Sequence, residues 1–220
     1  ALRVLRRLIT LRGVLTDPRE RGSLYVALAQ RRYLTGRYRG AFAMAQRAAA
    51  MPLDPTAEWF NTILLAWIHT ARGDWEVARR ELDRVLARPE IVTHPFLHNV
   101  GRLMRARLSA IRGDIAGALE DAERAEEAFG DHRMPFVREL AGVFIAYARS
   151  RAGDRAAARG WYDEVLRRTS ERGGGADAPT RVQFALDQFG WGEEAEAARE
   201  ARRALEAIDA AGDARGDDLR

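Results

Sequence analysis

The chain has 220 residues, of which 47% are hydrophobic and none is cysteine, and its formal net charge is +4. This apolar content excludes bulk disorder. The absence of cysteine excludes disulfides, thiolate metal sites and cysteine nucleophiles, and it favours a cytoplasmic location. The 36 basic residues, all arginine, are interleaved with 32 acids, a pattern typical of solvated helix faces, so we expect no nucleic-acid binding through this segment. No apolar run approaches the roughly 20 residues that span a bilayer, so we expect no membrane span.

Amphipathic runs bounded by proline, glycine and capping residues predict helices along the whole chain. The first run looks like the second half of a hairpin and follows a non-methionine start, so we expect residues 1–13 to be a helix from a preceding hairpin. Asp17 with Pro18, and Asp54 with Pro55, mark the N-caps of later helices. The expected helices are 2–12, 18–35, 38–51, 55–72, 75–88, 94–112, 115–129, 132–152, 155–171, 179–189 and 193–211.

Glycine and alanine recur at fixed positions between and within these helices. The glycines are 37 to 40 residues apart and stand at Gly36, Gly73, Gly113, Gly153 and Gly192. An alanine precedes each glycine by seven residues and follows it by five: Ala29, Ala66, Ala106, Ala146 and Ala185, then Ala41, Ala78, Ala118, Ala158 and Ala197. Glycine supplies the positive φ that ends a helix, and a small residue on each helix allows a close crossing. The spacing therefore predicts helical hairpins, with larger residues such as Leu82, Tyr162 and Leu205 filling the helix contacts.

The repeat also divides the chain into segments. Four hairpins are expected in residues 14–171, and a flexible linker in residues 172–178, because Gly173, Gly174 and Gly175 stand in a row there. A final hairpin or cap is expected at 179–211, and the polar segment 212–220 is expected to be disordered.

The first hairpin resembles the tetratricopeptide repeat (TPR). Gly36, Tyr38, Ala41, Ala48 and Pro52 stand where that family has its turn glycine, aromatic residue, alanines and closing proline. The resemblance covers about residues 18 to 211 and implies an all-α, right-handed α-α superhelix, a TPR-like solenoid of about five hairpins. The spacing departs from the family's 34 residues, so the first helices should be longer and the curvature different. Longer repeats of this kind resemble those in the sensor arms of bacterial transcription regulators of the maltose-activator type and of related signalling ATPases.

The same resemblance implies a binding groove, because the first helices of TPR proteins line a concave face. Aromatic residues, one arginine and small polar groups on that face suit a peptide or an extended protein segment. The alternative is that Phe60, Trp67 and Tyr147 pack against a neighbouring hairpin. The positions that this register places in the groove are Gln30, Tyr33, Phe60, Trp67, Thr70, Arg107, Tyr147 and Ser150.

No pattern for metal binding or catalysis is complete. His94 and His98 are four residues apart and could hold a metal with His132, but no further ligand stands at a readable spacing and Pro95 is explained as a helix start. Hydrolase elbows, phosphate loops and paired zinc ligands are missing from the sequence. We therefore expect no catalytic residue, no metal and no cofactor.

Two functions remain open. The first is an interaction scaffold or adaptor that grips a protein or peptide segment in its groove. The second is a sensor arm of a multidomain regulator, in which a small molecule or a partner protein shifts the equilibrium of attached domains. An enzyme is the least expected alternative, and the sequence does not indicate an oligomeric state.

Overall fold

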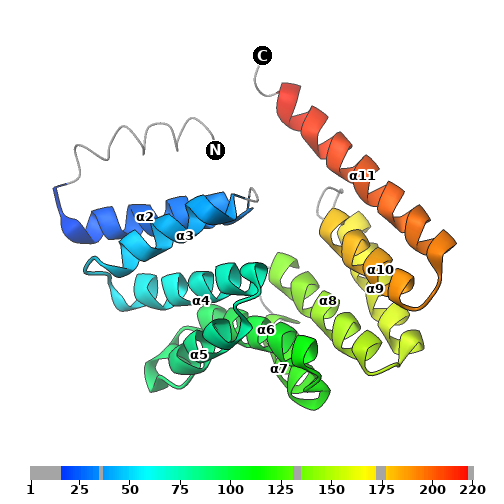
Figure 1. The fold of residues 1–220 in the computed structure, drawn as a ribbon, viewed down its shortest axis with the longest axis horizontal. Helices are drawn as coiled ribbons and strands as arrows, with labels where there is room; N and C mark the ends of the chain where they lie inside the picture. The colour runs from blue at the N-terminus through cyan, green and yellow to red at the C-terminus, as the bar shows by residue number, and fades with distance from the viewer. Residues whose placement is uncertain (1–15, 35–36, 131–134, 172–176, 218–220) are drawn as a thin grey trace. The chain divides into compact units, whose positions relative to one another are not determined.

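The computed structural model describes residues 16–34, 37–130, 135–171 and 177–217. These ranges contain the α-helices α2 to α11 and one 3-10 helix, η1, and no strand (Figure 1). The all-α prediction is therefore confirmed for the described residues. The expected helix at 2–12, the turn at Gly36 and most of the expected linker lie outside the described ranges.

The chain forms two compact units, residues 1–105 and 106–220. Unit 1 contains α2 (Pro18–Leu34), α3 (Tyr38–Ala49), α4 (Pro55–Arg72), α5 (Trp75–Leu86), η1 (Pro89–Thr93) and the first part of α6 (Pro95–Arg112). Its core joins α2, α3 and α4 through buried apolar side chains that include Leu24, Leu28, Leu64 and Ile68. Burial of these side chains is what fixes the two hairpins of unit 1 against each other.

Unit 2 contains the end of α6, then α7 (Ile115–Gly130), α8 (Pro135–Arg151), α9 (Arg155–Glu171), α10 (Ala178–Gly190) and α11 (Glu194–Asp217). Ala110, Ala118 and Ala148 pack together where α6, α7 and α8 meet. Further along, the buried Tyr162 ring of α9 stacks on Phe184 of α10 with 4.6 Å between ring centres. The Tyr162 ring therefore lies at the contact between two successive hairpins.

The repeat positions behave as the sequence predicts. Gly73, Gly113, Gly153 and Gly192 have φ of 82°, 86°, 83° and 82°. The residue after each glycine closes the turn, as when the Asp74 amide donates to the His69 carbonyl oxygen at 2.9 Å. Every repeat alanine is buried, and the most exposed of them, Ala185, shows only 7% of its surface. The burial of these alanines is what a close crossing of the two helices in a hairpin requires.

The starts of α2 and α4 follow the predicted caps, and one short helix was not predicted. The Asp54 Oδ1 atom accepts the Ala57 amide at 3.0 Å, which confirms the cap of α4, and Asp17 Oδ1 accepts the Arg19 amide at 2.8 Å. Residues 89–93 form η1, a 3-10 helix that periodicity did not predict. Its Ile91 side chain is fully buried, so tertiary packing explains this short helix.

The last hairpin differs from the prediction in two respects. Leu205 was expected to fill a helix contact, but 60% of its surface is exposed, because no described helix packs on that side of α11. In addition, α11 continues to Asp217, into the segment 212–220 that was expected to be disordered. Residues 218–220 lie outside the described ranges.

Candidate functional site

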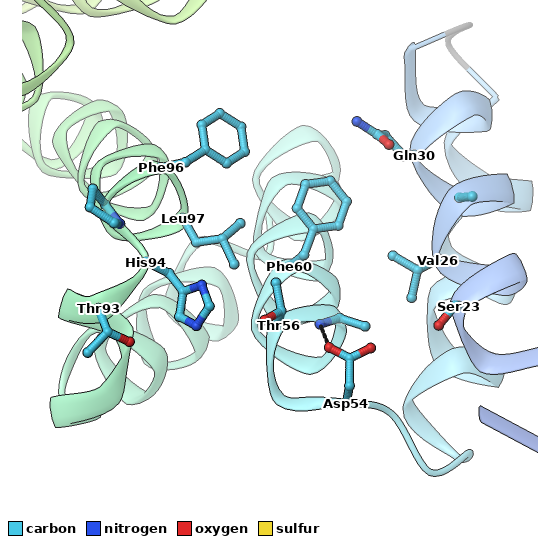
Figure 2. Close-up of a pocket in the computed structure, with 13 residues that line it drawn as sticks. Ser23, Val26, Gln30, Asp54, Thr56, Phe60, Thr93, His94, Phe96 and Leu97 are labelled. Carbon is cyan, nitrogen blue, oxygen red and sulfur yellow. Dashed lines mark hydrogen bonds between the residues drawn. The ribbon is translucent and has the colours of Figure 1, made fainter. Parts of the chain in front are cut away.

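A pocket of about 600 Å³ lies in unit 1 between α2, the start of α4 and the start of α6 (Figure 2). These three helices are the first helices of their hairpins. The residues that line it are Ser23, Val26, Ala27, Gln30, Asp54, Thr56, Ala57, Phe60, Thr93, His94, Pro95, Phe96 and Leu97. The pocket therefore lies between the first helices of three successive hairpins.

The start of α4 forms the centre of the pocket and is held by local interactions. Asp54 caps the helix through the Ala57 amide, and Pro55 occupies the first helical position with its φ already suited to a helix. Phe60 follows on the same helix and packs its partly buried ring against the core of unit 1. In Figure 2 the Phe60 ring lies between the Leu97 and Val26 side chains.

The wall that leads into α6 is held by packing between aromatic rings and by η1. The His94 ring meets the nearly buried Trp59 ring edge-on, with 4.9 Å between ring centres. Ile91, three residues earlier, anchors η1 in the core. These contacts fix the segment that presents Phe96 and Leu97 to the pocket.

The lining combines a largely apolar surface with a few polar groups. Val26, Phe60 and Leu97 give the apolar surface, and Phe96 adds a ring that is 36% exposed. Asp54 is the one carboxylate among the lining residues, and one of its oxygens is already engaged in the helix cap. Such a surface suits an apolar side chain accompanied by neutral hydrogen-bonding groups, as in a peptide.

The structure brings some of the predicted groove residues of unit 1 together. Gln30 and Phe60 both line the pocket. The Tyr33 and Trp67 rings are 5.5 Å apart, so these residues link α2 to α4 and are half-buried. The Thr70 hydroxyl donates to the Ala66 carbonyl oxygen of its own helix at 2.8 Å. Only two of the five predicted residues in this unit therefore line the pocket itself.

The other predicted groove residues belong to unit 2 and lie against protein groups. The Arg107 guanidinium carbon is 5.9 Å from the centre of the Phe144 ring. The partly buried Tyr147 ring packs against the alanine cluster at the meeting of α6, α7 and α8. The Ser150 Oγ atom accepts the Trp191 Nε1–H at 3.1 Å. The use of these positions by a ligand stays a prediction.

Ser150 belongs to a hydrogen-bond network around the buried Asp187. The Tyr162 hydroxyl donates to Asp187 Oδ2 at 2.7 Å, Gln183 donates to Asp187 Oδ1 at 3.3 Å, and Ser150 also donates to this carboxylate. Burial raises the pKa of Asp187 above its ordinary value, against the lowering effect of these donors and of Arg151. Burial, with the neighbouring Asp187 charge, also raises the pKa of Tyr162. The network joins α8, α9 and α10 by polar contacts.

Sequence reasoning missed several lining residues of the pocket. Ser23 stands at the same distance from Gly36 as Phe60 does from Gly73, so the register could have identified it. Phe96 and Leu97 carried no such signal, because η1 sets the direction in which α6 begins. The pocket wall at α6 therefore depends on tertiary packing.

Neither a protein-family model nor the sequence of a curated protein matches this chain. Solved structures do match it. One is a crystal structure of nearly identical TPR-like repeats from a putative kinesin light chain of Podosopora anserina, with 17% identity, a TM-score of 0.55, and coverage of 89% of this chain and 96% of that one. A single-residue variant of the same repeats gives 15% identity and the same TM-score of 0.55, and the match covers 83% of this chain and 92% of the variant.

These matches and the register of turns and alanines agree on one architecture. The fold is that of a TPR-like helical repeat. In this TPR-like chain, no group of three or more histidine, aspartate or glutamate side chains within the described ranges is placed to hold a metal ion. His132 lies outside those ranges. Among the described helices of the TPR-like fold, none combines the length and apolar character needed to cross a bilayer.

Proposed function

We propose that this chain is a non-catalytic interaction scaffold or adaptor that binds a peptide or protein segment in the pocket of unit 1. The observation that carries the proposal is the pocket between three first helices, where the Phe60 and Phe96 rings and apolar neighbours line one open space. Aromatic side chains in a concave surface are the usual anchors of protein recognition. The TPR-like fold supports the same conclusion, since stacked hairpins present first helices to a ligand.

The lining defines the kind of segment that would bind. An apolar side chain of the ligand packs against Phe60, Val26 and Leu97, and neighbouring main-chain amides meet Gln30 and Ser23 at the edge. A catalytic role has no support in this pocket, because Asp54 caps α4 and the His94 ring packs on Trp59. We include a cytoplasmic location in the proposal on the absence of cysteine.

A peptide library displayed on phage and selected against the whole chain tests this proposal. Selected peptides should share an apolar anchor residue, and Phe60→Ala should weaken their binding about tenfold or more, as loss of an anchor does. Trp75→Ala is the matched control, because Trp75 is an exposed aromatic residue of unit 1 on α5 and does not line the pocket. Equal binding by the folded Phe60→Ala variant and the wild type would refute the assignment.

A sensor arm of a bacterial transcription or signalling regulator is the second candidate. Two observations favour it: the repeat spacing of 37 to 40 residues, and a pocket volume of about 600 Å³, which lies in the range of small-molecule sites. A thermal-shift screen of small metabolites separates the two candidates. A metabolite that raises the melting temperature of the wild type but not of Phe60→Ala, without any selected peptide, would favour the sensor arm.

A further inference from the structure

Distance from the turn glycine identifies equivalent positions in every hairpin. Six and three residues before the glycine, the first helices carry Gln30 and Tyr33, Trp67 and Thr70, Arg107 and Ala110, and Tyr147 and Ser150. In α10 the same two positions are Leu186 and Phe189. The last hairpin thus has two large apolar residues where the earlier hairpins are mostly polar or aromatic.

In three of the four earlier hairpins, one of these positions contacts a residue of the following hairpin. The contacting side chain from the following hairpin is aromatic in three cases: Tyr33 meets Trp67, Arg107 meets Phe144, and Ser150 meets Trp191. In these three hairpins, the face that carries these positions therefore lies against the following hairpin.

The second helix of a hairpin also contacts the first helix of the following hairpin. It does so through the residue that stands 13 positions after the turn glycine. Leu86 of α5 lies against Gly101 of α6, where an added Cβ would be only 3.0 Å from Leu86 Cδ2. The equivalent Glu126 of α7 accepts a hydrogen bond from Arg138 of α8 at 2.9 Å. Both helices of a hairpin therefore contribute to the surface on which the next first helix packs. The equivalent residue of α11 is Leu205.

In the last hairpin, the described helices leave this surface exposed. Its exposed large apolar side chains, here called the terminal apolar face, are Val182 (43% exposed), Leu186 (60%), Phe189 (65%), Leu205 (60%) and Ile208 (50%). In the described part of unit 2, these are all of the strongly exposed large hydrophobic side chains. The position of Val182 is far more buried in the preceding hairpin, where Val143 is only 8% exposed. A terminal repeat that stood free in water would be expected to have a polar outer face.

We propose that the terminal apolar face binds an amphipathic helix, which packs there as the first helix of a following hairpin would. The proposal goes beyond the pocket of unit 1 and is independent of it. The proposal rests on continuity with the preceding interfaces between hairpins. In each of them, the first helix of one hairpin lies against both helices of the hairpin before it. Figure 1 shows α10 and α11 side by side, so both can contact one added helix.

The helices α4 and α6 define the chemistry of such a partner. Each has large apolar residues at every fourth position and a small residue beside the first of them: Phe60, Leu64 and Ile68 with Asn61, and Val100, Met104 and Leu108 with Gly101. In α4 the small residue faces the preceding second helix, since Asn61 Nδ2 donates to the Ala45 carbonyl oxygen at 3.0 Å. The partner helix therefore carries this apolar pattern, a small residue opposite Leu205, and an aromatic residue near Leu186 and Phe189.

A labelled peptide with the sequence of residues 54–74, which is α4 with its cap and turn, is a suitable probe. A staple on its polar side and a short arginine tag keep it helical and dissolved, because an isolated helix of this length is marginal in water. Fluorescence anisotropy with the whole chain should show saturable binding. Leu186→Glu combined with Phe189→Glu should weaken it about tenfold or more, because both apolar anchors are lost.

Matched controls make the result specific. Trp75→Glu combined with Val92→Glu changes two similarly exposed apolar residues of unit 1 and should leave binding of the peptide unchanged. The Phe60→Ala variant, which removes the pocket's anchor, should also bind it normally. A peptide with Leu64→Gln and Trp67→Gln should not bind. Circular dichroism should show the wild-type helix content for both double variants.

Three outcomes would overturn the proposal. The first is the absence of saturable binding by the wild-type chain. The second is undiminished binding by the folded Leu186→Glu/Phe189→Glu variant. The third is a wild-type dimer in light scattering that this variant converts to a monomer, because a second copy would then be the occupant of the face.

Discussion

In both units, the first helix of each hairpin presents a face at the same distances from the turn glycine. The side chains on this face differ in chemistry between the two units. In unit 1 the face opens into an apolar pocket in which Gln30 and Phe60 line free space. In unit 2 the equivalent face carries Ser150, which donates to the buried Asp187, and Asp187 also accepts the Tyr162 hydroxyl. A shared backbone register therefore sets where a side chain points, while its neighbours decide whether it meets a ligand or the protein itself.

The face in unit 1 is therefore suited to binding a ligand, whereas the face in unit 2 holds helices of the protein together. The polar groups around Asp187 satisfy one another, so they stabilise and specify the contact between α8, α9 and α10. The pocket of unit 1 leaves apolar surface uncovered and fixes its walls through caps and ring contacts. Variants in the two units should accordingly differ in which property they change.

Overpacking a helix crossing should have the largest effect, and the same effect in both units. Ala78→Leu and Ala158→Leu each add volume at a fully buried repeat position and should cost about 1 to 3 kcal/mol of unfolding free energy. Urea unfolding followed by circular dichroism measures the loss. Ala156→Leu, at an exposed position of α9, should be nearly neutral. Unchanged unfolding of both buried variants would contradict the shared register.

Removing a polar group from the first-helix face should lower the unfolding free energy more in unit 2 than in unit 1. Tyr162→Phe removes the hydroxyl that donates to the buried Asp187 carboxylate at 2.7 Å and should cost about 1 to 3 kcal/mol. In unit 1, Gln30→Ala at the edge of the pocket should change the unfolding free energy by less than about 0.5 kcal/mol. Equal losses of unfolding free energy for the two variants, measured in the same urea titrations, would contradict the difference between the two faces.

The cap of α4 should contribute a smaller, local effect. Asp54→Ala removes the acceptor of the Ala57 amide and should cost about 1 kcal/mol, the usual cost of losing an N-cap. Asp54→Ser keeps an acceptor at this position and should restore most of the stability. Chemical denaturation compares the three proteins, and a serine variant as unstable as the alanine variant would contradict the capping role.

The pH dependence of stability should show the smallest effect, confined to unit 2. Burial raises the folded-state pKa of Asp187 above its ordinary value of 3.8, so folding favours the protonated carboxyl. Its stabilising contribution is therefore present below pH 3.8 and is lost as the pH rises through the folded pKa. Asp187→Asn removes this dependence, so its stability relative to the wild type should increase from about pH 4 to pH 7. A difference that stays constant across this range would contradict the raised pKa.

The hairpins were predictable because their signals are local. A positive φ at Gly73 or Gly113 and a small residue at Ala78 or Ala118 are requirements of one turn and one crossing, so they recur in the sequence at fixed spacing. Ring contacts and burial could not be read in this way. Trp67 stands in the groove register, but its half-buried ring meets Tyr33 of the preceding hairpin.

The pocket and the terminal apolar face depend on elements that are distant in the sequence. Phe96 reaches the pocket because η1, anchored by Ile91, directs the start of α6. Leu205 has the same apolar character and register as Leu86, and its exposure depends only on what packs beside it. Periodicity predicts which side of a helix is apolar, but the partner of that side is a tertiary property.

The matching turns have a consequence for how such a chain can change its length. At Gly73 and Gly113 the backbone has nearly the same φ, an aspartate follows, and its amide closes the turn at 2.9 Å in both cases. Deletion of residues 74–113 would join Gly73 to Asp114 and so recreate the same Gly-Asp turn. Unequal recombination between such turns can therefore insert or remove a whole repeat while every junction keeps a conformation that the chain already adopts.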